Sequence, residues 1–138
     1  MPSIEFFVPG NPTPKQSVNK GKKSFYTDPK AKNYEGIVRD FAHQAMEKAA
    51  LKIAEDAVTI HVICYRPIPK KFSQKRTKLA LEGIQKPITR PDTQNFLKGV
   101  YDGMNQIVYQ DDAQITDEFV SKRYSDRIGV LVRAEWEF

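Results

Sequence analysis

Apolar residues recur at every second position in three segments of this sequence, which is the spacing of a half-buried β-strand. The alternating apolar positions are Ile4, Phe6 and Val8, then Val58, Ile60, Val62 and Cys64, and finally Ile128, Val130, Val132, Ala134 and Trp136. Between the first two segments the spacing becomes helical. This change begins at Asp28-Pro29, a pair typical of a helix N-cap followed by the first helical residue. The apolar positions of that helix are Tyr34, Ile37, Val38, Phe41, Ala42, Ala45 and Ala49.

Two shorter helices are expected further along, a basic one ending before Gly83 and a second over residues 93–104. Residues 114–124 and 128–138 are expected to form a C-terminal β-hairpin joined at Ser125-Asp126-Arg127. The predicted order is therefore β-α-β-α-α-β-β, an α+β arrangement in a single compact domain over residues 1–138.

The composition, with 40% hydrophobic and 28% charged residues, is that of an ordinary globular domain. The lone cysteine, Cys64, excludes an intrachain disulfide. No apolar stretch approaches the ~20 residues that cross a bilayer, and the N-terminus has no signal-peptide pattern. We therefore expect a cytoplasmic protein with no membrane partner.

The net charge of +5 is unevenly distributed along the chain. Residues 1–90 carry 17 Lys and Arg against 8 Asp and Glu, whereas residues 91–138 carry 5 against 9. A basic part that attracts phosphate and an acidic part that holds metal suit a nuclease. The charge distribution by itself is equally compatible with a protein whose charged side chains only face solvent.

The segment from Thr89 to Ile115 carries most of the functional signal. Asp92 precedes the helix over 93–104, where an aspartate commonly serves only as an N-cap. A polar stripe with helical spacing follows, and by itself it could be a solvated face. It consists of Asn95, Lys98, Asp102 and Asn105. Asp111-Asp112 then places two like charges side by side, which a buried site tolerates only with a cation.

Together these residues supply what phosphodiester hydrolysis needs. Mg²⁺ takes hard oxygen ligands, usually one or two carboxylates with waters and substrate phosphate. A bound metal activates water and stabilises charge on the phosphate, and a nearby lysine adds positive charge. Asp92, Lys98 and the Asp111-Asp112 pair form such a set if the helix N-terminus meets the start of the hairpin.

These residues resemble the signature of the RusA family of Holliday-junction resolvases, PD-x-x-N-x-x-K followed by DD-[AS]-Q-[IV]. The matching positions are Pro91-Asp92, Asn95, Lys98 and Asp111-Asp112-Ala113-Gln114-Ile115. The likeness extends to Val8-Pro9-Gly10-Asn11-Pro12, Lys15-Gln16 and Lys122-Arg123-Tyr124, and so to nearly the whole chain. Members of that family are compact α+β dimers, many encoded by phages, that cut branched DNA with Mg²⁺.

The resemblance implies a magnesium-dependent endodeoxyribonuclease acting in DNA recombination and repair, with Mn²⁺ as a substitute and no small-molecule cofactor. Metal-activated water would attack a phosphodiester of a four-way junction. The implied catalytic residues are Asp92, Lys98 and Asp112. The implied metal ligands are Asp92, Gln94, Asp111 and Asp112, with Asp112 ranked before Asp111. The expected DNA-binding residues are Lys15, Lys22, Lys23, Lys70, Lys71, Lys75, Arg76 and Arg90.

Gln94 departs from the pattern, because several family members carry a second aspartate there. A glutamine oxygen can ligate Mg²⁺ but brings no charge. The metal site is then weaker, or Glu118 or Asp117 compensates, or activity is impaired. We expect a retained but modified site. The alternatives are a catalytically impaired relative that only binds branched DNA, and a basic RNA-binding module.

A homodimer is also expected. Resolving a four-way junction requires nicks in two opposed strands, and one subunit has a single acidic site. A twofold dimer matches the symmetry of the junction. Phe7 and Ile63 are candidates for its interface.

Overall fold

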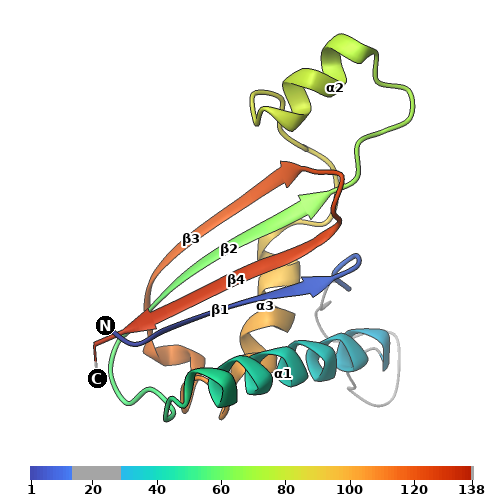
Figure 1. The fold of residues 1–138 in the computed structure, drawn as a ribbon. Coiled ribbons are helices and arrows are strands. Elements are labelled where there is room, and N and C mark those ends of the chain that lie inside the picture. Colours follow the sequence, from blue (N-terminus) through green and yellow to red (C-terminus); the bar gives the residue numbers. More distant parts are fainter. Residues whose placement is uncertain (14–28, 138) are drawn as a thin grey trace.

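The computed structural model describes residues 1–13 and 29–137; for residues 29–32 it describes the backbone alone. The predicted order of elements is confirmed (Figure 1). The elements are β1 (Ser3–Pro9), α1 (Pro29–Ala49), β2 (Val58–Arg66), α2 (Gln74–Leu81), α3 (Thr93–Met104), the short 3₁₀ helix η1 (Asp112–Gln114), β3 (Ile115–Tyr124) and β4 (Gly129–Trp136).

The four strands form one mixed sheet in the order β1-β4-β2-β3. β4 is antiparallel to both β1 and β2, and β3 is parallel to β2. The two C-terminal strands therefore run in opposite directions and follow each other closely, as expected. They do not form the ladder of a simple hairpin, however, because β2 lies between them. The connection over residues 125–128 is long enough to cross the roughly 10 Å between strands two positions apart.

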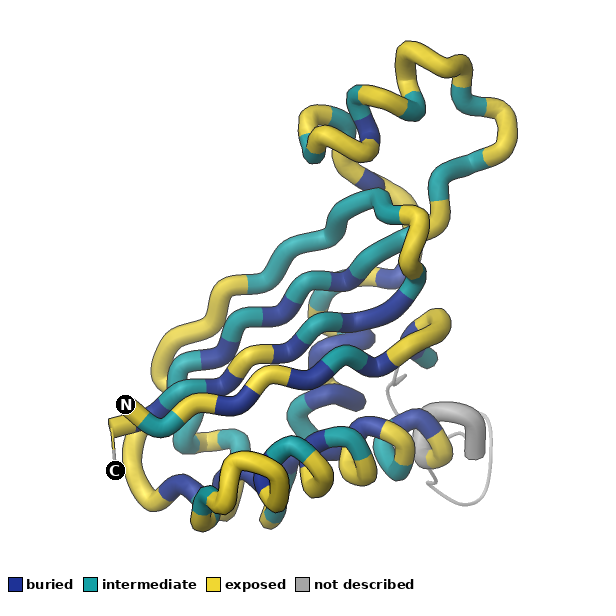
Figure 2. The backbone as a smooth tube through the Cα atoms, viewed as in Figure 1, coloured by how far each residue is buried: buried dark blue, intermediate teal, exposed yellow. Residues whose placement is uncertain are grey.

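Helices α1 and α3 cover the same face of the sheet (Figure 1). The predicted inward positions of β1, β2 and β4 are all buried. Ile128, predicted to begin the last strand, lies just before β4 and is half-buried. Figure 2 shows the resulting alternation along the strands. In α1 the buried side chains are Tyr34, Val38, Ala42 and Met46, spaced four residues apart. Ile37 was expected inside but is 38% exposed, because it lies to one side of this narrow stripe.

The segment from Pro67 to Pro91 carries α2 away from the sheet, beyond the ends of β2 and β3 (Figure 1). Ser73 caps α2 by accepting a hydrogen bond from the Arg76 N–H at 3.2 Å. Within α2 only Ala80 is buried. Among the described residues, no helix has the length and apolar character needed to span a membrane.

Candidate active site

Helix α3 begins at Thr93, and Asp92 occupies its N-cap position with an extended backbone. The Asp92 side chain nevertheless makes no capping hydrogen bond to the helix. Its nearest polar contact is long, 3.5 Å from Asn95 Nδ2 to Asp92 Oδ2. The position is thus that of a cap, but the exposed carboxylate is not used as one, and its oxygens remain open to solvent.

The chain just before Asp92 is tied to the edge of the sheet by Lys122 of β3. The Lys122 ammonium donates to the carbonyl of Thr89 at 2.6 Å and to that of Pro91 at 3.2 Å. Exposed Arg90 lies between these two anchored carbonyls. Because charge-assisted hydrogen bonds are stronger than neutral ones, Lys122 fixes the entry of the chain into α3, and with it the position of Asp92.

The two neighbouring carboxylates of the acidic pair have different surroundings. Asp111 caps η1, accepting from the Ala113 N–H at 3.0 Å. Gln114 completes a capping box, because its side-chain oxygen accepts from the N–H groups of Asp111 at 3.1 Å and Gln110 at 2.8 Å. The amide nitrogen of Gln114 donates to the carbonyls of Ala54 at 3.0 Å and Asp56 at 3.1 Å. Gln114 thus ties the acidic turn to the loop before β2.

Asp112 has a perturbed carboxyl group. Its pKa is raised, first by burial and then by repulsion from Asp111 and Asp102; its own backbone N–H and the ammonium of Lys98 act in the opposite direction. Asp102 and Lys98 both belong to α3. The fold therefore brings the acidic turn against the polar stripe of α3, where one cation faces three carboxylates.

Tyr101 links this region to β3. Its hydroxyl donates to Glu118 Oε2, and its backbone carbonyl accepts from the Tyr109 hydroxyl at 2.8 Å. Burial raises the pKa of Tyr101 above its usual range, and the carboxylates of Glu118 and Asp112 raise it further. Glu118 and Asp112 thus both act electrostatically on the Tyr101 phenol.

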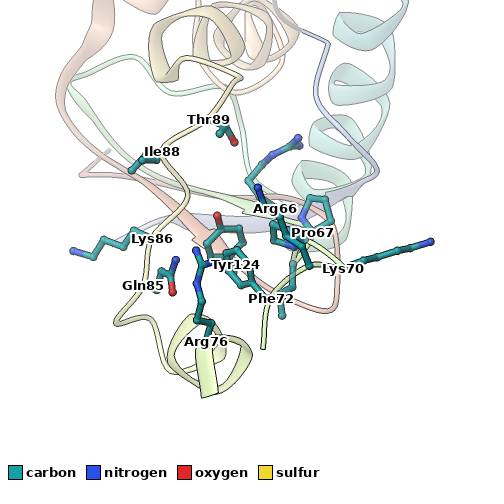
Figure 3. Close-up of a pocket in the computed structure, with 13 residues that line it drawn as sticks. Arg66, Pro67, Lys70, Phe72, Arg76, Gln85, Lys86, Ile88, Thr89 and Tyr124 are labelled. Atoms are coloured by element: carbon teal, nitrogen blue, oxygen red, sulfur yellow. The ribbon is translucent and has the colours of Figure 1, made fainter. Parts of the chain in front are cut away.

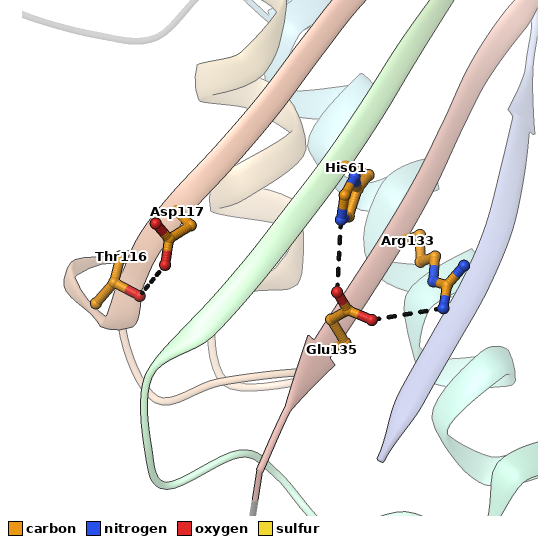
Figure 4. A network of polar contacts seen from close by, with 5 residues as sticks. All are labelled: His61, Thr116, Asp117, Arg133 and Glu135. Atoms are coloured by element: carbon orange, nitrogen blue, oxygen red, sulfur yellow. Dashed lines mark hydrogen bonds and ion pairs between the residues drawn. The ribbon is translucent and has the colours of Figure 1, made fainter. Parts of the chain in front are cut away.

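Alternation along β3 separates its side chains onto two faces. Glu118 pairs with buried Ile60 and lies on the face covered by the helices. Asp117 pairs with Thr59 on the opposite face, where its carboxylate accepts from the Thr116 hydroxyl at 3.1 Å. Figure 4 shows Asp117 on that outer face, together with His61, Arg133 and Glu135. Of the two residues expected to compensate for Gln94, Glu118 is the one placed on the side of Asp112.

Some predicted site residues are brought together and others are kept apart. Asp112, Asp111 and Lys98 interact electrostatically, joined by Asp102, which belonged to the predicted polar stripe but was not assigned to the site. Asp92 lies six residues before Lys98, roughly 9 Å along the helix axis. Gln94 is exposed on the first turn of α3. In the described part of the chain, no three His, Cys, Asp or Glu side chains gather closely enough to hold a metal by themselves.

The predicted DNA-binding residues divide into three groups. Lys70, Lys71 and Arg76 line a cavity of about 620 Å³ between α2 and the ends of β2 and β3 (Figure 3). Arg66 and Lys86 also line the cavity, and neither was predicted to bind DNA. Lys75 and Arg90 are exposed. Lys15, Lys22 and Lys23 lie outside the described residues.

Two comparisons with known proteins found a match to this chain. The family model described as "Endodeoxyribonuclease RusA" matches residues 9–135. The chain is also 36% identical over 141 residues to a Bacillus subtilis (strain 168) protein described as "Uncharacterized protein YqaN"; the match covers 96% of this chain and 97% of the relative. The sequence signature, the fold and the match to the family model agree: the chain belongs to the RusA family of endodeoxyribonucleases, whose activity is that of a Holliday-junction resolvase.

Proposed function

We propose that this protein is a magnesium-dependent, structure-selective endonuclease that nicks four-way DNA junctions. The observation that carries the proposal is the surroundings of Asp112. In a chain of the RusA family, this carboxylate has a raised pKa beside Asp111 and Asp102 and faces Lys98. Perturbed carboxylates grouped with a cation are typical of catalytic sites.

The donor set fits Mg²⁺. Asp112 and Asp92 offer carboxylate oxygens that are not used in helix capping. Asp111 and Asp102 repel the Asp112 carboxylate, and a cation beside Asp112 would offset that repulsion. Mg²⁺ commonly binds through one or two carboxylates and completes its shell with water and substrate phosphate. A site without a closed protein cage therefore suits this ion. When bound, Mg²⁺ would supply an activated water and offset the negative charge on the scissile phosphate.

The chain's own residues have separate roles in this proposal. Lys98 places a positive charge next to Asp112 and can neutralise charge that develops on the phosphate. Asp111 holds the acidic turn through its cap on η1 and has one carboxylate oxygen left for a water. Lys122 positions Asp92 by anchoring the two carbonyls before it.

The missing charge at Gln94 has two explanations within this proposal. In the first, the Gln94 oxygen is a neutral ligand and the metal site is weaker than in relatives with aspartate there. In the second, Glu118 completes the site. Its location on the helix-covered face of β3 and its hydrogen bond from Tyr101, a residue that Asp112 also influences, support the second explanation. The exposure of Gln94 on the first turn of α3 also favours it.

We further propose a twofold dimer formed through the outer face of the sheet. Phe7 pairs with Leu131 across the strands, and Leu131 pairs with Ile63, so these apolar side chains form one row. Phe119, 59% exposed, stacks on His61 beside that row with 4.9 Å between ring centroids. Two sites related by a twofold axis could nick opposed strands of a junction.

The decisive experiment incubates purified protein with a labelled four-way junction, with and without Mg²⁺, beside duplex DNA and a structured RNA of equal length. The proposal expects nicks in the junction only, and only with metal. Junction binding without cleavage would indicate a catalytically impaired relative. Tighter binding to the RNA would indicate the RNA-binding alternative.

A further inference from the structure

The cavity between α2 and the ends of β2 and β3 has an unusual lining. Of its 13 lining residues, five are cations and none is a carboxylate. The five are Arg66, Lys70, Lys71, Arg76 and Lys86. So many like charges around one hollow of about 620 Å³ repel each other in the free protein. An anion would relieve that repulsion.

Aromatic rings give this cavity a second kind of surface. Phe72 and Tyr124 meet edge to face, with their centroids 5.5 Å apart and their planes at 73°. The guanidinium of Arg76 lies 3.9 Å from the centroid of the Phe72 ring. Figure 3 shows these three side chains together at the centre of the pocket. On another side, a hydrogen bond of 2.7 Å from Arg66 to Asn11 Oδ1 holds the Arg66 guanidinium in place.

The cavity adjoins the candidate active site along the chain. Thr89 lines the cavity, and its carbonyl is one of the two that Lys122 anchors. Asp92 follows only three residues later, at most about 10 Å away along an extended chain. That span corresponds to roughly three stacked nucleotides of one strand.

We propose that this cavity binds an unpaired nucleotide of the branched DNA, within about three nucleotides of the phosphate nearest Asp92. Cations that track a phosphate backbone, combined with aromatic rings that accept a base, are the usual means of binding single strands. A base held in a duplex stack cannot enter the cavity, but one released at a branch point can. The inference rests on the proposed function and adds to it a source of preference for branched DNA.

The test combines changes in the protein with changes in the DNA, in EDTA so that no strand is cut. Single abasic nucleotides are placed at the branch point of a labelled four-way junction and at the next three positions. Fluorescence anisotropy then gives the affinity of the wild-type protein and of Tyr124→Leu, which keeps apolar volume but removes the ring. Stacking on one aromatic ring contributes enough that its loss should weaken junction binding about 5-fold or more. Duplex affinity should stay unchanged.

Non-additivity identifies the occupant. One abasic position should weaken junction binding by the wild-type protein by about the same factor as the Tyr124→Leu change does. The same abasic position should not weaken junction binding by Tyr124→Leu any further. If no abasic position matters to the wild-type protein, or if the two losses simply multiply, the cavity takes no base and the inference is wrong. The abasic series on the wild-type protein needs no variant, so it decides the point even if Tyr124→Leu folds poorly.

The cations are tested separately. Replacing Lys70 and Lys86 with Gln should flatten the log–log salt dependence of junction binding by about 1.8, from about 0.9 per phosphate contact. The matched control replaces two exposed cations outside the cavity, Lys48 and Lys52. An equal change in the control would overturn the special role of the cavity.

These results separate the inference from the proposed function. If the wild-type protein neither prefers nor cuts the junction, the proposed function fails. The cavity is then tested with a short oligothymidine. Weaker binding by Tyr124→Leu still supports a nucleotide site, and equal binding overturns it.

Discussion

Gln114 occupies the family signature next to the acidic pair, and its role can be predicted quantitatively. Its side chain makes four hydrogen bonds, two accepted from the N–H groups of Gln110 and Asp111 and two donated to the carbonyls of Ala54 and Asp56. Only the bond to Ala54 is partly buried. Water can partly replace the other three, so each of them contributes less than the bond to Ala54.

We therefore expect Gln114→Ala to lower the free energy of unfolding by about 2.5 kcal/mol. A net contribution of about 1 kcal/mol is assigned to the bond to Ala54 and about 0.5 kcal/mol to each exposed bond. For a chain of this size that loss corresponds to a fall of about 10 °C in Tm. Urea and thermal denaturation followed by circular dichroism, in EDTA, would measure both quantities.

The matched control is Gln110→Ala, which removes an exposed glutamine side chain but keeps the backbone N–H that donates to the Gln114 side chain. It should change stability by less than about 0.5 kcal/mol. Gln114→Glu loses both donors and sets a carboxylate against two carbonyls, so it should be no more stable than Gln114→Ala. A cost below about 1 kcal/mol for Gln114→Ala would refute the structural role assigned to this residue.

Three further predictions concern the carboxylates and the dimer. Asp112→Asn should raise the stability of the metal-free protein at pH 7. Because the pKa of Asp112 is raised in the folded state, its ionisation destabilises the fold, and stability is lost as the pH rises from the unfolded-state pKa through the folded-state pKa. The gain in Tm should disappear below about pH 4, the ordinary range of aspartate; a constant gain would contradict the assignment. If residue 94 is a metal ligand, Gln94→Asp should lower the Mg²⁺ concentration for half-maximal cleavage. If Glu118 completes the site instead, Glu118→Gln should be the damaging change. An unchanged Mg²⁺ concentration for half-maximal cleavage in Gln94→Asp rules out residue 94 as a ligand. Sedimentation should give a mass near twice 15.8 kDa, and Phe119→Asp should yield monomers. A wild-type monomer, both free and on the junction, would exclude the dimer.

The sequence predicted most of the elements because burial imposes a period on each of them. The alternation from Val58 to Cys64 and the helical spacing from Tyr34 to Ala42 both reappear as buried stripes. Strand pairing was harder to predict, because the residues of one strand do not specify which strands lie next to it. The insertion of β2 between β3 and β4 follows from how the whole sheet is assembled.

The candidate site was predictable in composition but not in geometry. Spacing placed Asp92 at the N-cap, but only three-dimensional coordinates reveal that its carboxylate makes no capping bond. Asp102 acts electrostatically on Asp112, and Arg66 lines the cavity with residues that are distant in sequence. No local pattern distinguishes either residue from a solvated side chain. The polar stripe was the one available signal for Asp102, since it shares that stripe with Lys98.

Asp112 is proposed to serve metal-dependent cleavage and not the fold or DNA binding. The most direct measurement compares wild-type protein with Asp112→Asn on one labelled four-way junction, for binding in EDTA and for cleavage in Mg²⁺. In Asp112→Asn cleavage should be abolished while junction affinity is equal or higher, because a negative charge has been removed near phosphate. Cleavage by Asp112→Asn at a rate near that of the wild type would refute the proposed role of Asp112.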